Sequence, residues 1–246
     1  MIEVRDLRKS FGPQAILDGV SFGIETGEAL VIIGRSGGGK SVLLKHIIGL
    51  LQPDAGQVVI DGEDITRMNE RELIRVRSKF GMVFQGAALF DSMNVAENVA
   101  FAFRRQRQFT EKEIANKVTE ALEMVDLPSI ERKRPSELSG GMRKRVGLAR
   151  AIIYHPEIVL YDEPTTGLDP IVSDSIDHLI IRVTERLKIT TVVVTHDMRT
   201  ARRVGHRIAM LHNKRIYVTG TPGDIFASPD PVVRQFIDGV ADPSHI

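Results

Sequence analysis

GRSGGGKS, residues 34–41, is the most informative segment of this chain. It fits the pattern G-x-x-x-x-G-K-[ST], in which glycines let successive backbone N–H groups turn inward around phosphate oxygens. An apolar run over 29–33 precedes the segment, and a helical pattern over 40–48 follows it. The segment therefore joins a buried strand to the positive N-terminal end of a helix. A phosphate-binding loop requires this context, which a chance match in a flexible turn lacks.

Two side chains of this loop carry the expected chemistry. The Lys40 ammonium would reach the β- and γ-phosphates of a nucleotide, and the Ser41 hydroxyl would ligate Mg²⁺. The expected nucleotide contacts within the loop are Gly34, Arg35, Ser36, Gly37, Gly38, Gly39, Lys40 and Ser41.

Other short apolar runs end at turn signals, as strands do. The run 158–161 ends at Asp162, and the run 191–195 ends at His196. Both runs are continuous rather than alternating, which is typical of parallel strands covered on both faces. Helical patterns alternate with them at 40–48, 142–154 and 173–187. This alternation predicts an α/β fold with a mostly parallel sheet and right-handed crossovers.

Two parts of the chain depart from this alternation. Residues 1–28 and 56–66, which include a tight Asp61-Gly62 turn, predict an antiparallel β addition at the N-terminal side. A largely helical insert is expected from about 90 to 155, with a break at the prolines. We therefore expect a single domain over 1–246, with a nucleotide-binding core and its antiparallel part at 1–88 and 156–228, a helical subdomain at 89–155 and a C-terminal extension at 229–246.

The composition excludes several classes of protein. Hydrophobic residues make up 42% and charged residues 26%, so the chain can bury a sizeable core. The net charge of +1, without an aromatic-rich platform, argues against a nucleic-acid partner. The absence of cysteine excludes disulfides and thiolate metal sites. No signal peptide is visible and no apolar run approaches the ~18–20 residues that cross a bilayer, so contact with a membrane is expected only through a partner.

Polar side chains at the ends of the predicted strands are candidates for catalysis. Asp162 can meet Mg²⁺ through water, and Glu163 can polarise an attacking water. His196 can sense or position the γ-phosphate, and the Gln85 amide can touch both Mg²⁺ and the water. Each has an ordinary alternative, since strands often end in acidic or polar turns. The phosphate loop upstream favours the catalytic interpretation of the two carboxylates.

The motifs follow one another in a fixed order along nearly the whole chain. They are GRSGGGKS at 34–41, Gln85, LSGGM at 138–142, IVLYDE at 158–163, GLD at 167–169 and His196. In this order they resemble the nucleotide-binding subunit of ATP-binding cassette (ABC) transporters. The resemblance implies a P-loop NTPase (RecA-like) fold and an enzyme that hydrolyses ATP with Mg²⁺.

The resemblance also assigns roles to single residues. The catalytic residues would be Glu163 as the base, His196 as the γ-phosphate contact, and Lys40. Mg²⁺ would be held by Ser41 and Gln85, with Asp162 in support.

Two further positions concern the nucleotide itself. By the same resemblance, Phe11 would stack on adenine. Val42 departs from the family pattern, which usually has a hydroxyl residue there for the α-phosphate. Backbone amides would have to make that contact, at a cost of about 1 kcal/mol.

A second glycine-rich segment, LSGGMRKR at 138–145, has a different expected partner. The family works as a head-to-tail dimer, in which the LSGG segment of one copy covers the ATP of the other. Ser139, Gly140 and Gly141 would therefore contact the partner's nucleotide, and the segment with Leu168 and Asp169 would join the two sites. Met142 stands where many relatives have glutamine. The next three residues, Arg143, Lys144 and Arg145, are predicted to form a largely solvated helix face.

Four longer segments carry a narrower resemblance. IGRSGGGKSVLLKHIIGLL, FQGAALFDSMNVAENVAF, ELSGGMRKRVGLARAI and PDPVVRQFIDGVAD are similar to the ATPase of Mla-type transporters, which move phospholipids between the inner and outer membranes of Gram-negative bacteria. The implied partners are a second copy of the chain, an integral membrane permease, a small cytoplasmic regulatory subunit and a periplasmic lipid-binding subunit. The implied location is the cytoplasmic face of the bacterial inner membrane. The alternative is an ABC ATPase that drives cell-envelope remodelling through a membrane scaffold, without transport.

Three surface segments have two interpretations each. The apolar residues near 84–103 predict either helical-subdomain core or a groove for a permease helix. Arg104, Arg105 and Arg107 predict a solvated face or a lipid-headgroup contact. Residues 229–237 place four apolar side chains on one helical face, which indicates a helix docked on its own subunit or a clasp on the second copy.

Overall fold

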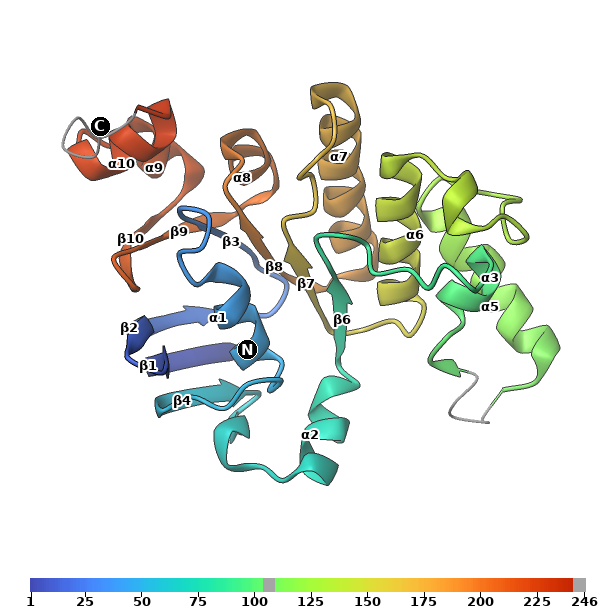
Figure 1. The fold of residues 1–246 in the computed structure, drawn as a ribbon, viewed down its shortest axis with the longest axis horizontal. Coiled ribbons are helices and arrows are strands. Elements are labelled where there is room, and N and C mark those ends of the chain that lie inside the picture. Colours follow the sequence, from blue (N-terminus) through green and yellow to red (C-terminus); the bar gives the residue numbers. More distant parts are fainter. Residues whose placement is uncertain (104–108, 241–246) are drawn as a thin grey trace. The chain divides into compact units, whose positions relative to one another are not determined.

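The computed structural model describes residues 1–103 and 109–240, and the chain forms two compact units. The first unit contains Met1–Arg77 and Val192–Ile246, and the second contains Ser78–Thr191. Figure 1 labels most of the helices and strands of both units. The segments that lie outside the described residues include Arg104, Arg105, Arg107 and the C-terminal tail 241–246.

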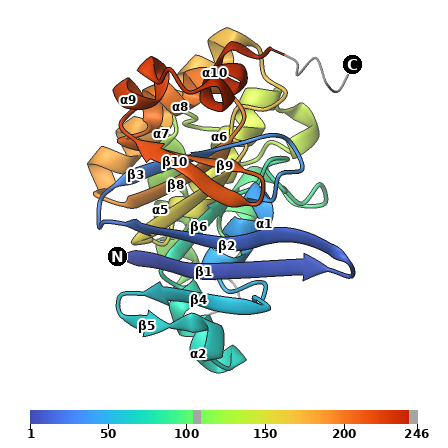
Figure 2. The same ribbon diagram turned by 90° about the vertical axis from the view of Figure 1, so that its left-hand side faces the viewer.

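An antiparallel sheet forms the N-terminal part of the first unit, as Figure 2 shows. Its strands lie in the order β2 (Gln14–Ile24), β1 (Ile2–Phe11), β4 (Ala55–Ile60) and β5 (Glu63–Asp64). The Asp61-Gly62 turn between β4 and β5 has φ values of 50° and 85°, as a two-residue hairpin turn requires. Ile2, in β1, pairs with Ile24 and Ile60 and is fully buried. The predicted antiparallel addition is confirmed.

A second sheet of the first unit carries the phosphate loop. Its strands lie in the order β10 (Arg215–Gly220), β9 (Arg207–His212), β3 (Ala29–Ile33) and β8 (Thr190–Thr195). Strand β3 runs parallel to β9, and β9 runs antiparallel to β10. Every residue of β3 and β8 is buried, which explains why their apolar runs are continuous.

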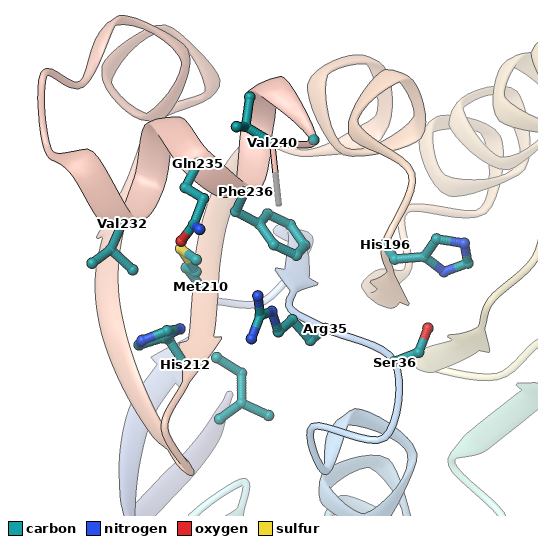
Figure 3. Close-up of a pocket in the computed structure, with 11 residues that line it drawn as sticks. Arg35, Ser36, His196, Met210, His212, Val232, Gln235, Phe236 and Val240 are labelled. Atoms are coloured by element: carbon teal, nitrogen blue, oxygen red, sulfur yellow. The ribbon is translucent and has the colours of Figure 1, made fainter. Parts of the chain in front are cut away.

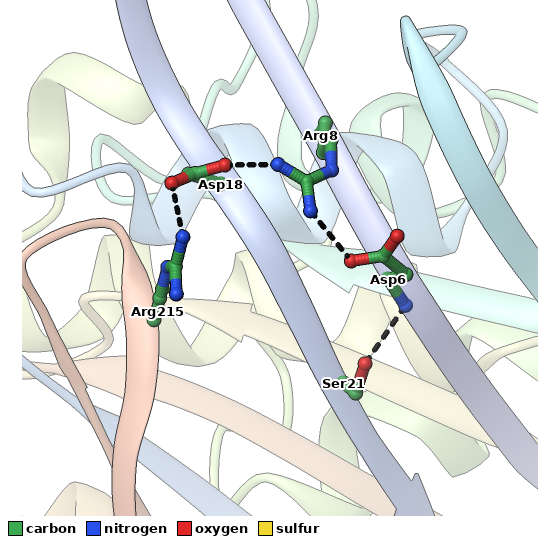
Figure 4. Close-up of polar contacts among 5 residues, drawn as sticks. All are labelled: Asp6, Arg8, Asp18, Ser21 and Arg215. Carbon is green, nitrogen blue, oxygen red and sulfur yellow. Dashed lines mark hydrogen bonds and ion pairs between the residues drawn. The ribbon is translucent and has the colours of Figure 1, made fainter.

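Strand β10 also lies beside β2 of the antiparallel sheet (Figure 2). Asp18 of β2 accepts a hydrogen bond from Arg215 of β10 at 2.6 Å and another from Arg8 of β1 (Figure 4). The Arg215 guanidinium holds the pKa of the Asp18 carboxyl below its usual range. Arg8 also donates to Asp6 at 3.1 Å. These charges therefore join the edge of the antiparallel sheet to the loop-carrying sheet.

The helices of the first unit are α1 (Lys40–Ile47), η1 (Ile65–Arg67), α2 (Glu70–Arg77), α8 (Met198–Val204), α9 (Pro222–Ala227) and α10 (Pro231–Asp238). Helix α10 is fixed to its own unit. Asp230 caps it by accepting the N–H groups of Val232 and Val233, and the Tyr217 hydroxyl donates to Asp230 at 2.9 Å. The Val233 side chain is fully buried. The contact with a second copy stays a prediction.

The second unit is built from two parallel strands and a group of helices. Strand β6 (Phe80–Val83) runs parallel to β7 (Ile158–Asp162). The helices are α3 (Val95–Val99), α5 (Glu111–Met124), η2 (Pro135–Glu137), α6 (Gly140–Ile152) and α7 (Pro170–Leu187). Helix α6 lies against β6, α3, α5 and α7. A Cβ at Gly81 of β6 would lie 2.4 Å from the Ala151 carbonyl oxygen, so glycine there lets α6 approach the strand closely.

Two helices of this unit begin earlier than the apolar pattern predicts. Helix α6 begins at Gly140 because the Ser139 hydroxyl accepts the N–H of Met142 at 3.2 Å. Helix α7 begins at Pro170 because the Asp169 carboxylate accepts the N–H groups of the second and third helical residues, both at 3.0 Å. Capping residues therefore set both starts.

The phenylalanines near 84–103 differ in burial. Phe103 is buried, with its ring centroid 4.1 Å from that of Tyr154 and 4.9 Å from that of Phe109. Phe84 and Phe90 are 38% and 41% exposed. The core interpretation is thus confirmed for Phe103, and a permease groove at the exposed rings stays a prediction.

The structure confirms the predicted α/β fold class. The structure contains mostly parallel strands next to an antiparallel sheet, with a separate helical region between β6 and β7. The subdomain limits proposed from the sequence, 1–88 with 156–228, 89–155 and 229–246, stay a prediction.

Candidate active site

The phosphate loop of the first unit runs from the end of β3 to the start of α1. Gly37 and Gly39 have φ values of 73° and 98°, which residues with a Cβ rarely adopt. At Gly34 a Cβ would lie 2.6 Å from the Leu211 carbonyl oxygen. These glycines are therefore required by backbone conformation or by close packing. A loop of this kind exposes its N–H groups to an anion.

Lys40 is held in place by the loop itself. Its side chain is buried, and Nζ donates to the carbonyl oxygens of Gly34 at 2.8 Å and Arg35 at 3.2 Å. Ser41 and Val42 follow in the first turn of α1, both half-buried. The ammonium is therefore positioned over the loop, and the positive end of α1 supports a phosphate there.

A cavity of about 280 Å³ opens beside the loop (Figure 3). Arg35 and Ser36 of the loop line it, together with His196, which follows β8. Its apolar side comes from Met210 and from Phe236 of α10. The structure therefore brings His196 next to the phosphate loop, with a guanidinium and a hydroxyl at the same opening. Such a lining suits an anionic group.

Phe11 closes strand β1 in the same unit. Its ring is 49% exposed, and Lys9 Nζ lies 5.7 Å from the ring centroid. An exposed aromatic ring can stack on a flat base.

The carboxylates of the second unit stand at the end of β7. Asp162 is the last residue of the strand, and Glu163 follows with a φ of 49°, a left-handed conformation that is rare for a residue with a Cβ. Only 7% of Glu163 is exposed. The Thr166 hydroxyl donates to Glu163 Oε2 at 3.1 Å. The turned backbone gives Glu163 a direction different from that of Asp162.

Gln85 leaves the same edge of this parallel pair. Val83 of β6 lies in register with Tyr161 of β7, so Gln85 and the two carboxylates follow neighbouring strand ends. Lys144 of α6 connects Gln85 with Glu163, because its Nζ donates to the carbonyl oxygen of Gln85 and, at 3.2 Å, to that of Glu163.

The prediction of a solvated face at Arg143, Lys144 and Arg145 is wrong for Lys144, which is only 7% exposed. Arg145 is half-buried and donates to Asp126 at 2.9 Å, so it too has protein partners. Arg143 is exposed and donates to the Leu138 carbonyl oxygen at 2.7 Å. Burial lowers the pKa of Lys144, and the nearby carboxylates of Glu163 and Asp162 oppose this effect.

Helical spacing contained a signal for the burial of Lys144. It lies three residues after Gly141 and three before Gly147, which places it on the small, packed face of α6.

The LSGG segment forms the N-terminal end of α6. Ser139 is exposed and caps the helix, as described above. A Cβ at Gly141 would lie 2.6 Å from Val172 of α7, and one at Gly140 would lie 3.2 Å from Leu168. Both glycines therefore allow the segment GLD and the start of α7 to pack closely against this end of the helix. Asp169 belongs to the same group through its cap of α7.

The residues expected to hold Mg²⁺ offer hydroxyl, amide and carboxylate oxygens, which are the donors that Mg²⁺ prefers. They are Ser41, Gln85 and Asp162. Within residues 1–103 and 109–240, the structure contains no group of three or more His, Cys, Asp or Glu side chains placed to hold a metal. This donor set suits Mg²⁺ bound partly by phosphate and water better than a metal enclosed by protein ligands.

No helix in the part of the chain that the structure describes is both long and apolar enough to span a membrane.

The phosphate loop of the first unit is typical of nucleotide-binding proteins, and comparison with known proteins gives the family of this chain. The family model described as ABC transporter matches residues 17–166, so the chain belongs to the ABC transporter family. A solved dimer of the ATP-binding cassette MJ0796 bound to ADP and Pi is similar, with a TM-score of 0.82 and 32% identity over 90% of this chain and 99% of that one. The chain is thus the ATP-binding, ATP-hydrolysing subunit of an ABC transporter.

Curated relatives cover almost the whole chain. The probable ribonucleotide transport ATP-binding protein mkl of Mycobacterium leprae is 44% identical over 97% of this chain and 69% of its own length. The protein TRIGALACTOSYLDIACYLGLYCEROL 3 of Arabidopsis thaliana is 42% identical over 98% of this chain and 74% of its own length. The intermembrane phospholipid transport system ATP-binding protein MlaF of Escherichia coli is 39% identical over 98% of this chain and 90% of its own length. These relatives confirm the narrower resemblance, so the chain is an Mla-like ABC ATPase.

Proposed function

We propose that this ATPase energises phospholipid transport between the inner and outer membranes. The observation that carries the proposal is the 39% identity to the intermembrane phospholipid transport ATPase, which extends over 98% of this chain and 90% of that protein. A match of this extent includes the phosphate loop, the LSGG segment and helix α10. The proposed location is the cytoplasmic face of the bacterial inner membrane.

The proposed reaction is attack of water on the γ-phosphate of ATP, which breaks the bond between the γ-phosphorus and the bridging oxygen and releases ADP and phosphate. Lys40 and the loop N–H groups bind the β- and γ-phosphates, and Phe11 stacks on the adenine. Glu163 accepts the proton of the attacking water, while His196 contacts the γ-phosphate. Ser41, Gln85 and Asp162 would hold Mg²⁺, which neutralises charge on the phosphates when bound.

We propose that a second copy of the chain completes each site in a head-to-tail dimer. The exposed Ser139, with Gly140 and Gly141, then presents the N-terminal end of α6 to the partner's ATP. Ile171, two residues after Asp169, is 83% exposed, which is unusual for isoleucine and suits a surface that a partner covers. The solved MJ0796 cassette, to which the chain is similar, is itself dimeric.

The dimer predicts that Ser139→Arg will spare ATP binding by the isolated chain but reduce its hydrolysis at least about 100-fold, because the guanidinium blocks the approach of the partner's nucleotide. Nucleotide titration and steady-state phosphate release measure the two effects. Thr119→Arg, at an exposed hydroxyl residue of α5, is the matched control and should hydrolyse ATP normally. Full activity of Ser139→Arg would overturn the two-copy site.

The proposed transport partners are an integral membrane permease, a small cytoplasmic regulatory subunit and a periplasmic lipid-binding subunit. The exposed Phe84 and Phe90 are the proposed contact with the permease. The alternative function, envelope remodelling through a membrane scaffold, requires a membrane partner but no lipid cargo.

Purification of the intact complex from its native membrane separates the two functions. Mass spectrometry of the complex should find a permease together with bound phospholipid. A membrane scaffold without bound phospholipid would reject the transport proposal and favour remodelling.

A further inference from the structure

Helix α6 holds the segment around Gln85 at three points. Lys144 Nζ donates to the Gln85 carbonyl oxygen near the start of the helix. One turn later, Gly147 lets Ala87 approach, since a Cβ on this glycine would lie 3.3 Å from the Ala87 Cβ. A further turn along, Arg150 donates to the carbonyl oxygens of Ala87 and Ala88, both at 2.6 Å. One face of α6 therefore follows the backbone of this segment.

The segment requires such support because its backbone is unusual. Ala87 and Ala88 have φ values of 59° and 47°, a region that residues with a Cβ rarely occupy. Glu163 has the same property at 49°. Conformations of this kind persist only where the surrounding structure fixes them. Lys144 donates to the Gln85 carbonyl oxygen, two residues before Ala87, and to the Glu163 carbonyl oxygen at 3.2 Å, while Arg150 holds the carbonyls of Ala87 and Ala88 themselves.

We propose that Lys144 is a positioning residue for ATP hydrolysis, which sets the backbone of Glu163 and of Gln85 from one ammonium group. Lys144 touches no reacting atom in this role. It acts through the direction in which the Glu163 carboxylate and the Gln85 amide leave the backbone. The inference rests on the hydrolytic part of the proposed function and is independent of the transported lipid.

The choice of a lysine follows from the geometry of its site. The two carbonyl oxygens belong to different strand ends, and an ammonium can donate to both at once because it carries three N–H donors. Burial of a cation is unfavourable unless carbonyls or carboxylates compensate it, and here both carbonyls and the nearby Asp162 and Glu163 do so. Lys144 also lies five residues after Ser139 on the same helix. Helix α6 therefore carries both the end proposed to contact the partner's ATP and the lysine proposed to position the catalytic base.

The test compares three substitutions of Lys144 by ATP hydrolysis and ATP binding in the whole chain. Lys144→Met keeps the length of the side chain but removes its donors, so kcat should fall about 10- to 100-fold. The KM for ATP and the affinity measured by nucleotide titration should stay within about twofold, because the phosphate loop is untouched. Lys144→Arg, which restores several donors, should recover most of kcat, and Lys144→Gln, with a neutral donor, should fall between the two.

A matched control separates positioning from general effects of losing a lysine. Lys112→Met makes the same change at an exposed position of α5 and should hydrolyse ATP like the unmodified chain. Lys144→Met removes the donor of the Gln85 and Glu163 carbonyl oxygens, so it should melt a few degrees below Lys112→Met, and kcat is compared at a temperature where both variants are folded.

The outcomes that overturn the inference are distinct from failure of the proposed function. If Lys144→Met keeps its kcat within about twofold of the control, Lys144 does not position the site. If all three variants melt early and lose ATP binding in parallel with activity, its role is structural only. In both cases the unmodified chain still hydrolyses ATP, whereas absence of hydrolysis in the unmodified chain and in Lys112→Met would count against the ATPase itself.

Discussion

Glu163→Gln should bind ATP normally and lose about 10²- to 10⁴-fold of its hydrolysis rate, the range that a general base contributes. The substitution replaces a proton acceptor with an amide of the same size. The side chain is almost completely buried, and the Thr166 hydroxyl that donates to it at 3.1 Å can still donate to the amide oxygen. The site should therefore keep its shape and lose only the group that we propose accepts the proton from water.

Glu163→Gln should also change the assembly of the proposed dimer, because the variant cannot hydrolyse its ATP at the normal rate. In the proposed dimer, ATP that cannot be hydrolysed keeps both copies together, so Glu163→Gln should accumulate a closed dimer when ATP is added. Single-turnover hydrolysis measures the rate, and light scattering with and without ATP measures the dimer.

Glu157→Gln is the matched control for this variant. It makes the same change at an exposed glutamate just before the other end of β7, where Glu157 pairs with Lys79 at 3.5 Å. This control should hydrolyse ATP at the normal rate and should not trap the dimer. Near-normal turnover of Glu163→Gln would show that another group is the base.

Lys40→Ala should lose most of the ATP affinity as well as hydrolysis. A hydrogen bond from a charged group contributes about 1.5–3 kcal/mol, which corresponds to about 10- to 150-fold in affinity. The loss should lie toward the upper end, because the ammonium also holds the Gly34 and Arg35 carbonyl oxygens from inside the loop. Removing it thus leaves those carbonyls without their donor and weakens the loop that must receive the phosphates.

Calorimetric titration with ATP measures this effect directly. Lys45→Ala, an exposed lysine on the same helix, is the control and should bind ATP like the unmodified chain. Equal affinities of the two variants would show that Lys40 does not contact the nucleotide.

Glu163 and Lys40 show how much of this site the sequence predicts. Short motifs predict both residues, because a loop that follows a buried strand and a carboxylate at a strand end are local patterns. The left-handed conformation of Glu163 left no comparable signal, since nothing in the adjacent letters requires it. Its support comes from Lys144, nineteen residues earlier along the chain.

Local patterns were sufficient for most of the fold. Continuous apolar runs indicated the buried strands β3, β7 and β8, because a strand covered on both faces has no polar side. The Asp-Gly pair indicated the hairpin, because its two positive φ values suit these residues. The apolar pattern predicts the helix starts less accurately. The capping side chains of Ser139 and Asp169 set the starts of α6 and α7, and the spacing of apolar residues contains no information about caps.

Burial of polar groups depended instead on contacts between distant segments. From the sequence alone, the three consecutive cations after LSGGM predict a solvated helix face. Lys144 is nevertheless buried, because the segments that follow β6 and β7 bring two backbone carbonyls to it. Gly34 and Gly81 are required by carbonyl oxygens far away in the chain, at Leu211 and Ala151. Short sequence motifs thus predict which residue types lie at the nucleotide site of this ATPase. Tertiary packing determines which other side chains hold those motifs in position, because only packing decides what each side chain contacts.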